Sequence, residues 1–183
     1  MNDLKIFKKN LPSEMLEIDL DIFHENSMDP QRMRGLIEEL EVEMKSLSAA
    51  QKQLKTTHRI VGNIYSREIF IPKGTLLVGK IHLVDSVNIC SQGDITLITE
   101  NGIARVQAPH TVFGKPGIKR VGLAHEDTVW TTIINTEEQD VKKIEEKYFR
   151  ENYDDIEALP PESNQILLET MEGFVKCQQQ LSQ

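Results

Sequence analysis

The stretch GTLLVGKIHLVDSVNICSQG, residues 74–93, decides the fold of this 183-residue chain. Runs of aliphatic and β-branched residues alternate there with Gly and Asp, which is typical of short strands joined by tight turns. The same texture extends from about Thr57 to Asn135 and includes Asn101-Gly102, a pair that favours a tight hairpin. We therefore expect the middle of the chain to form a β-barrel.

Eight strands are predicted, and strands this short and this closely spaced favour a closed barrel or jelly roll. Their bounds are Ile69–Ile71, Thr75–His82, Val87–Cys90, Ile95–Thr99, Ile103–Gln107, Thr111–Phe113, Arg120–Ala124 and Val129–Ile134. The expected fold class is mainly β, with a long N-terminal helix and C-terminal helices around one barrel. The expected domains are a helical arm at 1–56, the barrel at 57–135 and an acidic helical tail at 136–183.

A long helix is expected to begin at Asp29-Pro30, because Asp caps free backbone N–H groups and Pro suits the first helical position. Apolar residues then recur at the spacing of a coiled-coil seam. The seam residues are Met33, Ile37, Leu40, Met44, Leu47, Gln51 and Leu54. Two interpretations stay open: the seam packs on the chain's own barrel, or it joins copies of the chain into a dimer or trimer.

Three further helices are expected outside the barrel. One is a short helix over 13–25, the second runs from the capping-box residue Thr136 to about residue 151, and the third spans 163–180. Residues 152–162, which include two prolines, are predicted to be a linker. Whether the last helix docks on the barrel or on a partner is left open.

Charge and cysteine usage exclude several functions. The net charge is −8, and by segment it is −3 over 1–56, +2 over 57–135 and −7 over 136–183. An acidic chain without a basic stripe is a poor ligand for phosphate backbones, so no nucleic-acid partner is expected. The two cysteines lack the spacing of a zinc ribbon or a disulfide framework. No segment reads as a signal peptide or a membrane span, so we expect a soluble protein with no membrane partner.

The spacing within 74–93 resembles the first motif of the cupin family, which reads Gly, five residues, His-x-His, three or four residues, Glu, six residues, Gly. Gly74 and Gly93 keep this spacing, while the ligand positions hold Lys80, His82 and Ser86. The resemblance implies a double-stranded β-helix barrel, in which one of these metal-ligand residues, His82, is retained.

Pro116-Gly117 resembles the second cupin motif, with Arg120 at the position of its His. Family sites hold a metal with three imidazoles and a carboxylate, whereas two cations here would repel a divalent ion. We therefore predict no metal and no other cofactor. Lys80, His82 and Arg120 are instead candidate ligands for an anion such as a carboxylate, a phosphate or a sugar acid. The alternative is that the two cations point outward, or pair with Asp85, Glu126 or Asp127.

No catalytic residue is predicted. Metal-free cupin epimerases use a His base and a Tyr acid on barrel strands, and we expect no barrel tyrosine beside His82, because Tyr65 precedes the predicted core strands. Neither cysteine has a neighbouring His, and no nucleophile elbow or phosphate-binding Gly loop is present. The chain is therefore expected not to be an enzyme.

A narrower resemblance covers roughly residues 57–150. It is carried by segments such as Ile71-Pro72-Lys73-Gly74-Thr75, Lys115 to Gly122 and His125 to Ile133, which look like small cupin-like proteins of tailed bacteriophages, virion-associated or uncharacterised. This resemblance implies a non-enzymatic structural or accessory protein that self-associates and docks on virion proteins, in the virion or the host cytoplasm. Two other functions stay open. One is a sensor or metal-independent isomerase for a sugar or anionic metabolite, and the other is an effector that binds a host protein.

Overall fold

The computed structural model describes residues 29–46 and 54–157, which form eleven strands and three helices. In chain order these are α3 (Pro30–Ser46), β1 (Thr56–Val61), β2 (Ile64–Ile71), β3 (Leu76–Val78), β4 (Ile81–His82), β5 (Ser86–Gln92), β6 (Asp94–Thr99), β7 (Gly102–Gln107), β8 (His110–Gly114), β9 (Val121–Ala124), β10 (Thr128–Asn135), α4 (Val141–Tyr148), β11 (Phe149–Arg150) and α5 (Asp154–Glu157). The predicted mainly β architecture is confirmed.

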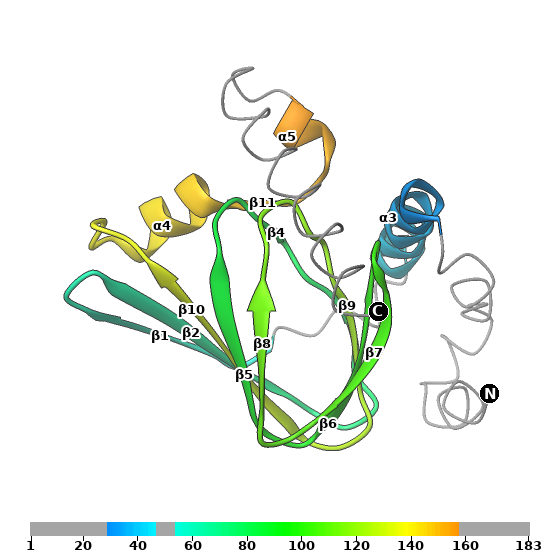
Figure 1. Ribbon diagram of the computed structural model, residues 1–183, viewed down its shortest axis with the longest axis horizontal. Helices are drawn as coiled ribbons and strands as arrows, with labels where there is room; N and C mark the ends of the chain where they lie inside the picture. The colour runs from blue at the N-terminus through cyan, green and yellow to red at the C-terminus, as the bar shows by residue number, and fades with distance from the viewer. Residues whose placement is uncertain (1–28, 47–53, 158–183) are drawn as a thin grey trace, which may run out of the picture.

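Two antiparallel sheets face each other, as Figure 1 shows. One has the strand order β1-β2-β10-β5-β8 and the other β3-β9-β6-β7, while β4 pairs with β11. An apolar cluster fills the space between the sheets, with Ile71, Cys90, Ile95, Leu97, Val106 and Ala124 at its centre. Burial of these side chains is the main favourable contribution to the fold.

Gly93 is the point at which the chain passes from one sheet to the other, between β5 and β6. Its φ is 93°, a conformation that L side chains rarely adopt. A Cβ there would lie 2.4 Å from the hydroxyl of Thr128 and 2.5 Å from the carbonyl of Asp127. The glycine is therefore required both by the backbone conformation and by the closeness of the next strand.

The hairpin predicted at Asn101-Gly102 is present, with Thr99 opposite Gly102 where β6 turns into β7. The first hairpin, β1–β2, was largely missed. Strand β1 was not predicted, and of the eight residues of β2 only Ile69–Ile71 were predicted as a strand. The reason is physical. β1 is exposed or only half-buried along its whole length, so its sequence lacks the apolar alternation by which a strand is recognised.

The prediction of one strand over Thr75–His82 is wrong. The chain breaks after Val78, and its two halves pair with different partners, β3 with β9 and β4 with β11. At the break, the N–H of Gly79 donates to the carbonyl of Arg120 at 2.8 Å. The predicted strand Arg120–Ala124 likewise begins one residue later, at Val121.

Helix α3 begins at Pro30, as predicted, and the carboxylate of Asp29 accepts hydrogen bonds from the N–H groups of Gln31 and Arg32. Its seam residues Met33, Ile37 and Leu40 are buried. They pack on the outer face of the four-stranded sheet, against Leu76, Ile98, Val121 and Leu123. In this part of the seam the helix covers its own barrel, which was one of the two interpretations.

The rest of the seam is placed differently. Met44 is half-buried against the same cluster, but Leu54 lies beyond the helix and packs against the apolar cluster between the sheets. Leu47 and Gln51 lie outside the described residues, as do the helices predicted over 13–25 and 163–180. Self-association through the seam therefore stays a prediction.

Two buried polar contacts fasten α3 to the rest of the fold. The ammonium of Lys119, whose residue is fully buried, donates to the carboxylate of Glu41 and to the backbone carbonyl of Glu151. Buried Glu100 accepts two hydrogen bonds from Arg34, both at 2.8 Å, and one from the hydroxyl of Tyr153 at 3.0 Å. Helix α3, the barrel and the segment around α5 are thereby held together.

Helix α4 begins at Val141, not at the predicted Thr136. Asp140 is its N-cap, because its carboxylate accepts from the N–H of Lys143 at 3.0 Å. The helix closes one end of the barrel, where its Ile144 packs with Tyr65 of β2. Within the described segments, no helix is long and apolar enough to span a membrane.

Replacing Glu41 with Gln is expected to destabilise the fold by about 3 kcal/mol, because it leaves the buried ammonium of Lys119 without a counter-charge. Urea denaturation of the variant and the wild type measures this. The matched control is Glu43→Gln on the exposed side of the same helix, for which a change below about 0.5 kcal/mol is expected. Equal effects of the two substitutions would contradict the role of this pair.

Candidate functional site: the polar end of the barrel

The inner face of the five-stranded sheet changes from apolar to polar along the strands. One row of aligned residues, Ile69, Trp130 and Cys90, belongs to the apolar cluster. Two residues further toward α4, the aligned residues are Arg67 of β2, Thr132 of β10 and Asn88 of β5. The half of the barrel interior next to α4 is therefore polar.

Gly114 of β8 shows how closely the polar groups gather there. A Cβ on this glycine would lie 2.3 Å from Ser86 Oγ, 2.6 Å from Arg120 Nη2 and 2.9 Å from Asn88 Nδ2. The hydroxyl, the guanidinium and the amide thus surround one point. Because Gly114 has no side chain, these three groups can approach one another closely.

Asn88 is fixed by its neighbours. Its Nδ2 donates to Ser86 Oγ at 3.1 Å, and its Oδ1 accepts from the hydroxyl of Thr132 at 2.8 Å. Asn88, Ser86 and Thr132 are all buried. The network holds these groups of β5 and β10 in fixed orientations.

His82 lies in the same cluster and is only 5% exposed. Its Nδ1 lies 3.4 Å from Ser86 Oγ, and its ring meets that of Phe149 edge-on, with centroids 4.8 Å apart. Burial, together with the positive charges of Arg120 and Arg67, lowers the pKa of His82 to about 3. The imidazole is therefore neutral at neutral pH.

Arg120 is the least compensated charge of the site. Among the described residues no carboxylate lies within ion-pair distance of its guanidinium, and burial lowers its pKa. The alternative pairings with Asp85, Glu126 or Asp127 are not observed. Asp85 instead pairs with Lys115 at 3.0 Å, and Asp127 accepts from the N–H of Lys73.

Arg67 has a partner for part of its guanidinium. Its Nη1 lies 3.3 Å from Glu145 Oε1, which also accepts from the hydroxyl of Tyr65 at 3.0 Å. Its Nε is buried and, in the described part of the chain, is the one buried side-chain nitrogen or oxygen without a hydrogen-bond partner. The guanidinium also lies over the ring of Phe149 at 5.0 Å.

The structure brings together two of the three predicted anion ligands. His82 and Arg120 share the barrel interior, whereas Lys80 reaches outward to Glu145 at 3.5 Å and Glu151 at 3.1 Å. The carboxylate of Glu145, which contacts both Lys80 and Arg67, thus lies between Lys80 and the cluster.

Sequence reasoning missed Arg67, Asn88, Thr132 and Glu145. A signal for Arg67 exists, because Tyr65, Arg67, Ile69 and Ile71 occupy every second position of one strand. Tyr65, which was expected to precede the barrel, lies on a barrel strand and is fully buried. Its hydroxyl bonds to His58 and Glu145, and burial raises its pKa.

The donor set does not fit the metal of the family site. His82 is a single imidazole beside the cations Arg120 and Arg67, and no carboxylate or thiolate joins it. Across the described segments, no three His, Cys, Asp or Glu side chains converge on one point. Arginine N–H groups donate hydrogen bonds and bind anions, so these residues suit a negatively charged ligand.

Neither a protein-family model nor a curated protein matches the sequence. Solved structures similar to this chain include an RmlC-like cupin from Methanocaldococcus jannaschii, with 13% identity over 48% of this chain and 84% of that one, at a TM-score of 0.40. A double-stranded β-helix protein from Klebsiella pneumoniae shares 11% identity over 48% and 75%, at 0.42. Ectoine synthase from P. lautus shares 8% over 55% and 76%, at 0.45. These likenesses concern the fold alone.

Lowering the pH from 6.5 toward 3 is expected to destabilise the protein through His82. The unfolded imidazole takes up a proton near pH 6.5, and the folded one does so only near pH 3, so stability is lost as the pH falls through this window. Between pH 7 and pH 4.5 the wild type should lose about 2 kcal/mol more than His82→Gln in urea denaturation. His110→Gln, which removes an exposed imidazole, is the control and should follow the wild type. Parallel curves for wild type and His82→Gln would contradict the assignment.

Proposed function

We propose that the protein binds a small organic anion, with a carboxylate head, in the polar end of its barrel. The observation that carries this proposal is the guanidinium of Arg120, which is half-buried and has no carboxylate partner among the described residues. A half-buried charge without a partner is unfavourable, and a bound carboxylate would offset it through two parallel hydrogen bonds.

The surrounding groups support a ligand of single negative charge. Arg67 is already balanced by Glu145, so Arg120 is the one cation of the cluster whose charge is not met. The hydroxyl of Ser86 lies beside Arg120 and can donate a further hydrogen bond to an oxyanion, while the amide of Asn88 holds that hydroxyl in place.

Binding is favoured over turnover by the state of the candidate acid and base. A general base works best with a pKa near the working pH, and that of His82 is lowered to about 3. The hydroxyl of Tyr65, the nearest candidate acid, donates to Glu145 and has a raised pKa. We therefore favour a binding or sensing role over that of an isomerase.

Butyrate is expected to bind the wild type and to raise its melting temperature, and Arg120→Gln should weaken this binding at least 100-fold because the bidentate partner is lost. Titration calorimetry and thermal denaturation measure the two effects. Without butyrate, Arg120→Gln should be as stable as the wild type or more stable, since it removes a half-buried charge that no described carboxylate meets.

The control is Arg59→Gln, which removes an exposed arginine that pairs with Glu68 on β2. It should leave butyrate binding unchanged. Equal loss of binding in both variants would mean that the anion is attracted by net charge and not held at Arg120. A wild type that binds no carboxylate at millimolar concentration would refute the proposal.

A second candidate function is assembly with other proteins, as a virion component. It is supported by the resemblance of residues 57–150 to phage proteins and by large apolar side chains on the five-stranded sheet that are exposed, Val61, Ile64 and Phe113. Light scattering of the full chain, and mass spectrometry of purified virions from a host that produces it, test this role. A monomer that is absent from the particles would exclude it.

A further inference from the structure

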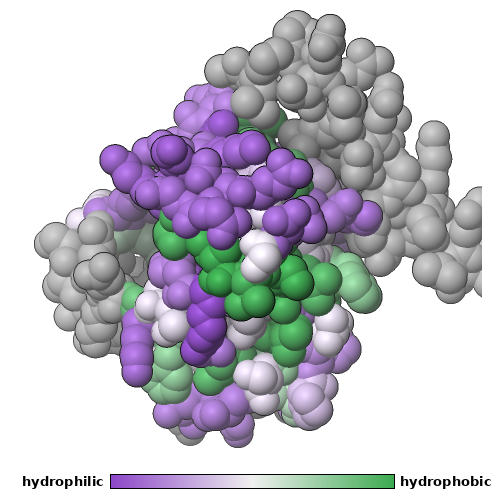
Figure 2. Space-filling model, turned by 90° about the vertical axis from the view of Figure 1, so that its left-hand side faces the viewer, coloured by the Kyte–Doolittle hydropathy of each residue, from purple (hydrophilic) through white to green (hydrophobic). Residues whose placement is uncertain are grey.

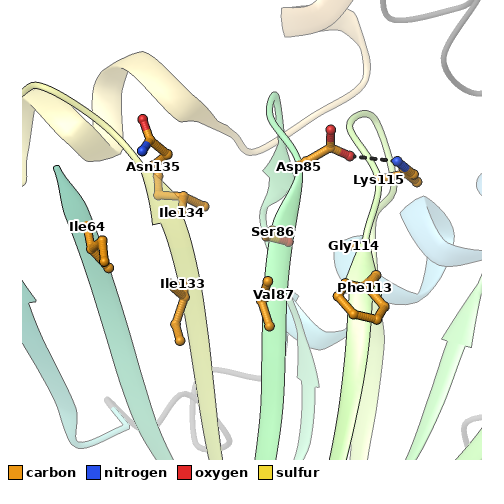
Figure 3. A pocket seen from close by; sticks show the side chains of 10 residues that line it. All are labelled: Ile64, Asp85, Ser86, Val87, Phe113, Gly114, Lys115, Ile133, Ile134 and Asn135. Carbon is orange, nitrogen blue, oxygen red and sulfur yellow. Dashed lines mark hydrogen bonds and ion pairs between the residues drawn. The ribbon is translucent and has the colours of Figure 1, made fainter.

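A groove of about 530 Å³ runs across the outer face of the five-stranded sheet. Figure 3 shows its apolar walls, which come from four neighbouring strands: Ile64 of β2, Ile133 of β10, Val87 of β5 and Phe113 of β8. Phe113 is 70% exposed and Ile64 is 53% exposed. Apolar residues also gather on the face of the molecule seen in Figure 2. The volume lies within the range of about 300–1,000 Å³ that is typical of small-molecule sites.

The groove and the polar cluster meet at two residues. Ser86 and Gly114 line the groove, and both belong to the cluster around Arg120. The ladder between β10 and β5 ends at Ile133 and Val87, whereas on the other side of β5 Ser86 still pairs with Gly114 of β8. Arg120 Nη2 lies 2.6 Å from the point where a side chain of Gly114 would begin. The paired residues Ser86 and Gly114 therefore stand between the apolar groove and the guanidinium, and the unpaired ends of β10 and β5 lie beside them.

Charged groups of the groove itself are already paired. Lys115 and Asp85 form an ion pair at 3.0 Å across its end next to α4, which Figure 3 shows as a dashed line. The lining between this pair and the middle of the sheet is apolar. The groove thus offers a surface for hydrocarbon, and the nearest uncompensated charge is that of Arg120 behind it.

We infer that the bound anion is an amphiphilic monocarboxylate, whose head lies at Arg120 and Ser86 and whose hydrocarbon tail lies in the groove between Val87, Phe113 and Ile133. This inference rests on the proposed function and names its ligand class. The head would pass between β10 and β5, beyond their last paired residues. The single negative charge of the head would pair with Arg120, which no described carboxylate meets. The tail would cover the exposed apolar side chains of the groove.

A second groove on the same face serves as a comparison. It has a volume of about 510 Å³ and is lined by Lys55, Thr57, Arg59, Glu68, Phe70 and Val129. Its lining is mostly polar, and none of its residues belongs to the cluster around Arg120. Phe70, which is 37% exposed, supplies a matched aromatic position outside the proposed site.

The test is titration calorimetry of the full chain with acetate, butyrate, hexanoate and octanoate. Each methylene that leaves water contributes up to about a fourfold gain in affinity, so octanoate should bind about 10- to 100-fold more tightly than butyrate. Phe113→Ser should reduce this gain to a few-fold and leave acetate binding unchanged. Phe70→Ser should retain the full gain. Octanol, which has the tail without the charge, should bind at least 100-fold more weakly than octanoate.

The outcomes separate the two proposals. If octanoate binds no more tightly than butyrate while Arg120→Gln still abolishes butyrate binding, the amphiphile inference is wrong and anion binding stands. If no acid binds, both proposals fail. If Phe113→Ser dissociates a dimer in light scattering and the gain with chain length is unchanged, the groove belongs to a second copy of the chain and the inference is wrong.

Discussion

The alternation of side chains along Lys119, Arg120 and Val121 is the constraint on which the rest of the structure depends. Successive residues of an extended chain point to opposite faces, so Lys119 and Val121 face α3 while Arg120 faces the barrel interior. Lys119 meets a carboxylate from α3, and Arg120 meets none among the described residues. Two adjacent cations of one segment therefore differ in environment. Lys119 pairs with α3, and the charge of Arg120 is available to an anionic ligand under the proposed function.

The polar end of the barrel gathers two arginines, an imidazole and a hydroxyl. The positions that resemble the two cupin motifs lie at strand ends and turns, and three of their side chains converge inside the barrel. Here those positions hold Arg120, His82 and Ser86, and the neighbouring strand β2 adds Arg67. Arginine and hydroxyl groups favour a negatively charged ligand over a metal ion.

Much of the fold was predictable because its turns are local. Gly74, Gly93 and Gly117 of the two motifs all have positive φ, so each is required by the backbone at its own position. Asn101-Gly102 acts in the same way at its hairpin. Such constraints can be recognised from a few residues, since they do not depend on what packs against them.

The features that were not predicted depend on contacts between distant segments. The seam of α3 has the spacing of a coiled coil, yet a helix that packs on a sheet needs the same spacing, and its partner is set by β3, β6 and β9. Glu145 joins the site because α4 folds back over the barrel end, more than sixty residues after the Arg67 and Lys80 that it contacts. Neither relation can be read from residues close together in the chain.

The neutrality of His82 follows from this same arrangement and bears on how a ligand would be held. Its imidazole lies beside Arg120 and Arg67, so the site already carries positive charge before any proton is added. A bound carboxylate would offset that charge and make protonation of His82 less unfavourable. Ligand binding and proton uptake by His82 would then be coupled. Burial and the positive charges of Arg120 and Arg67, the first of which meets no carboxylate among the described residues, together keep the imidazole of His82 neutral.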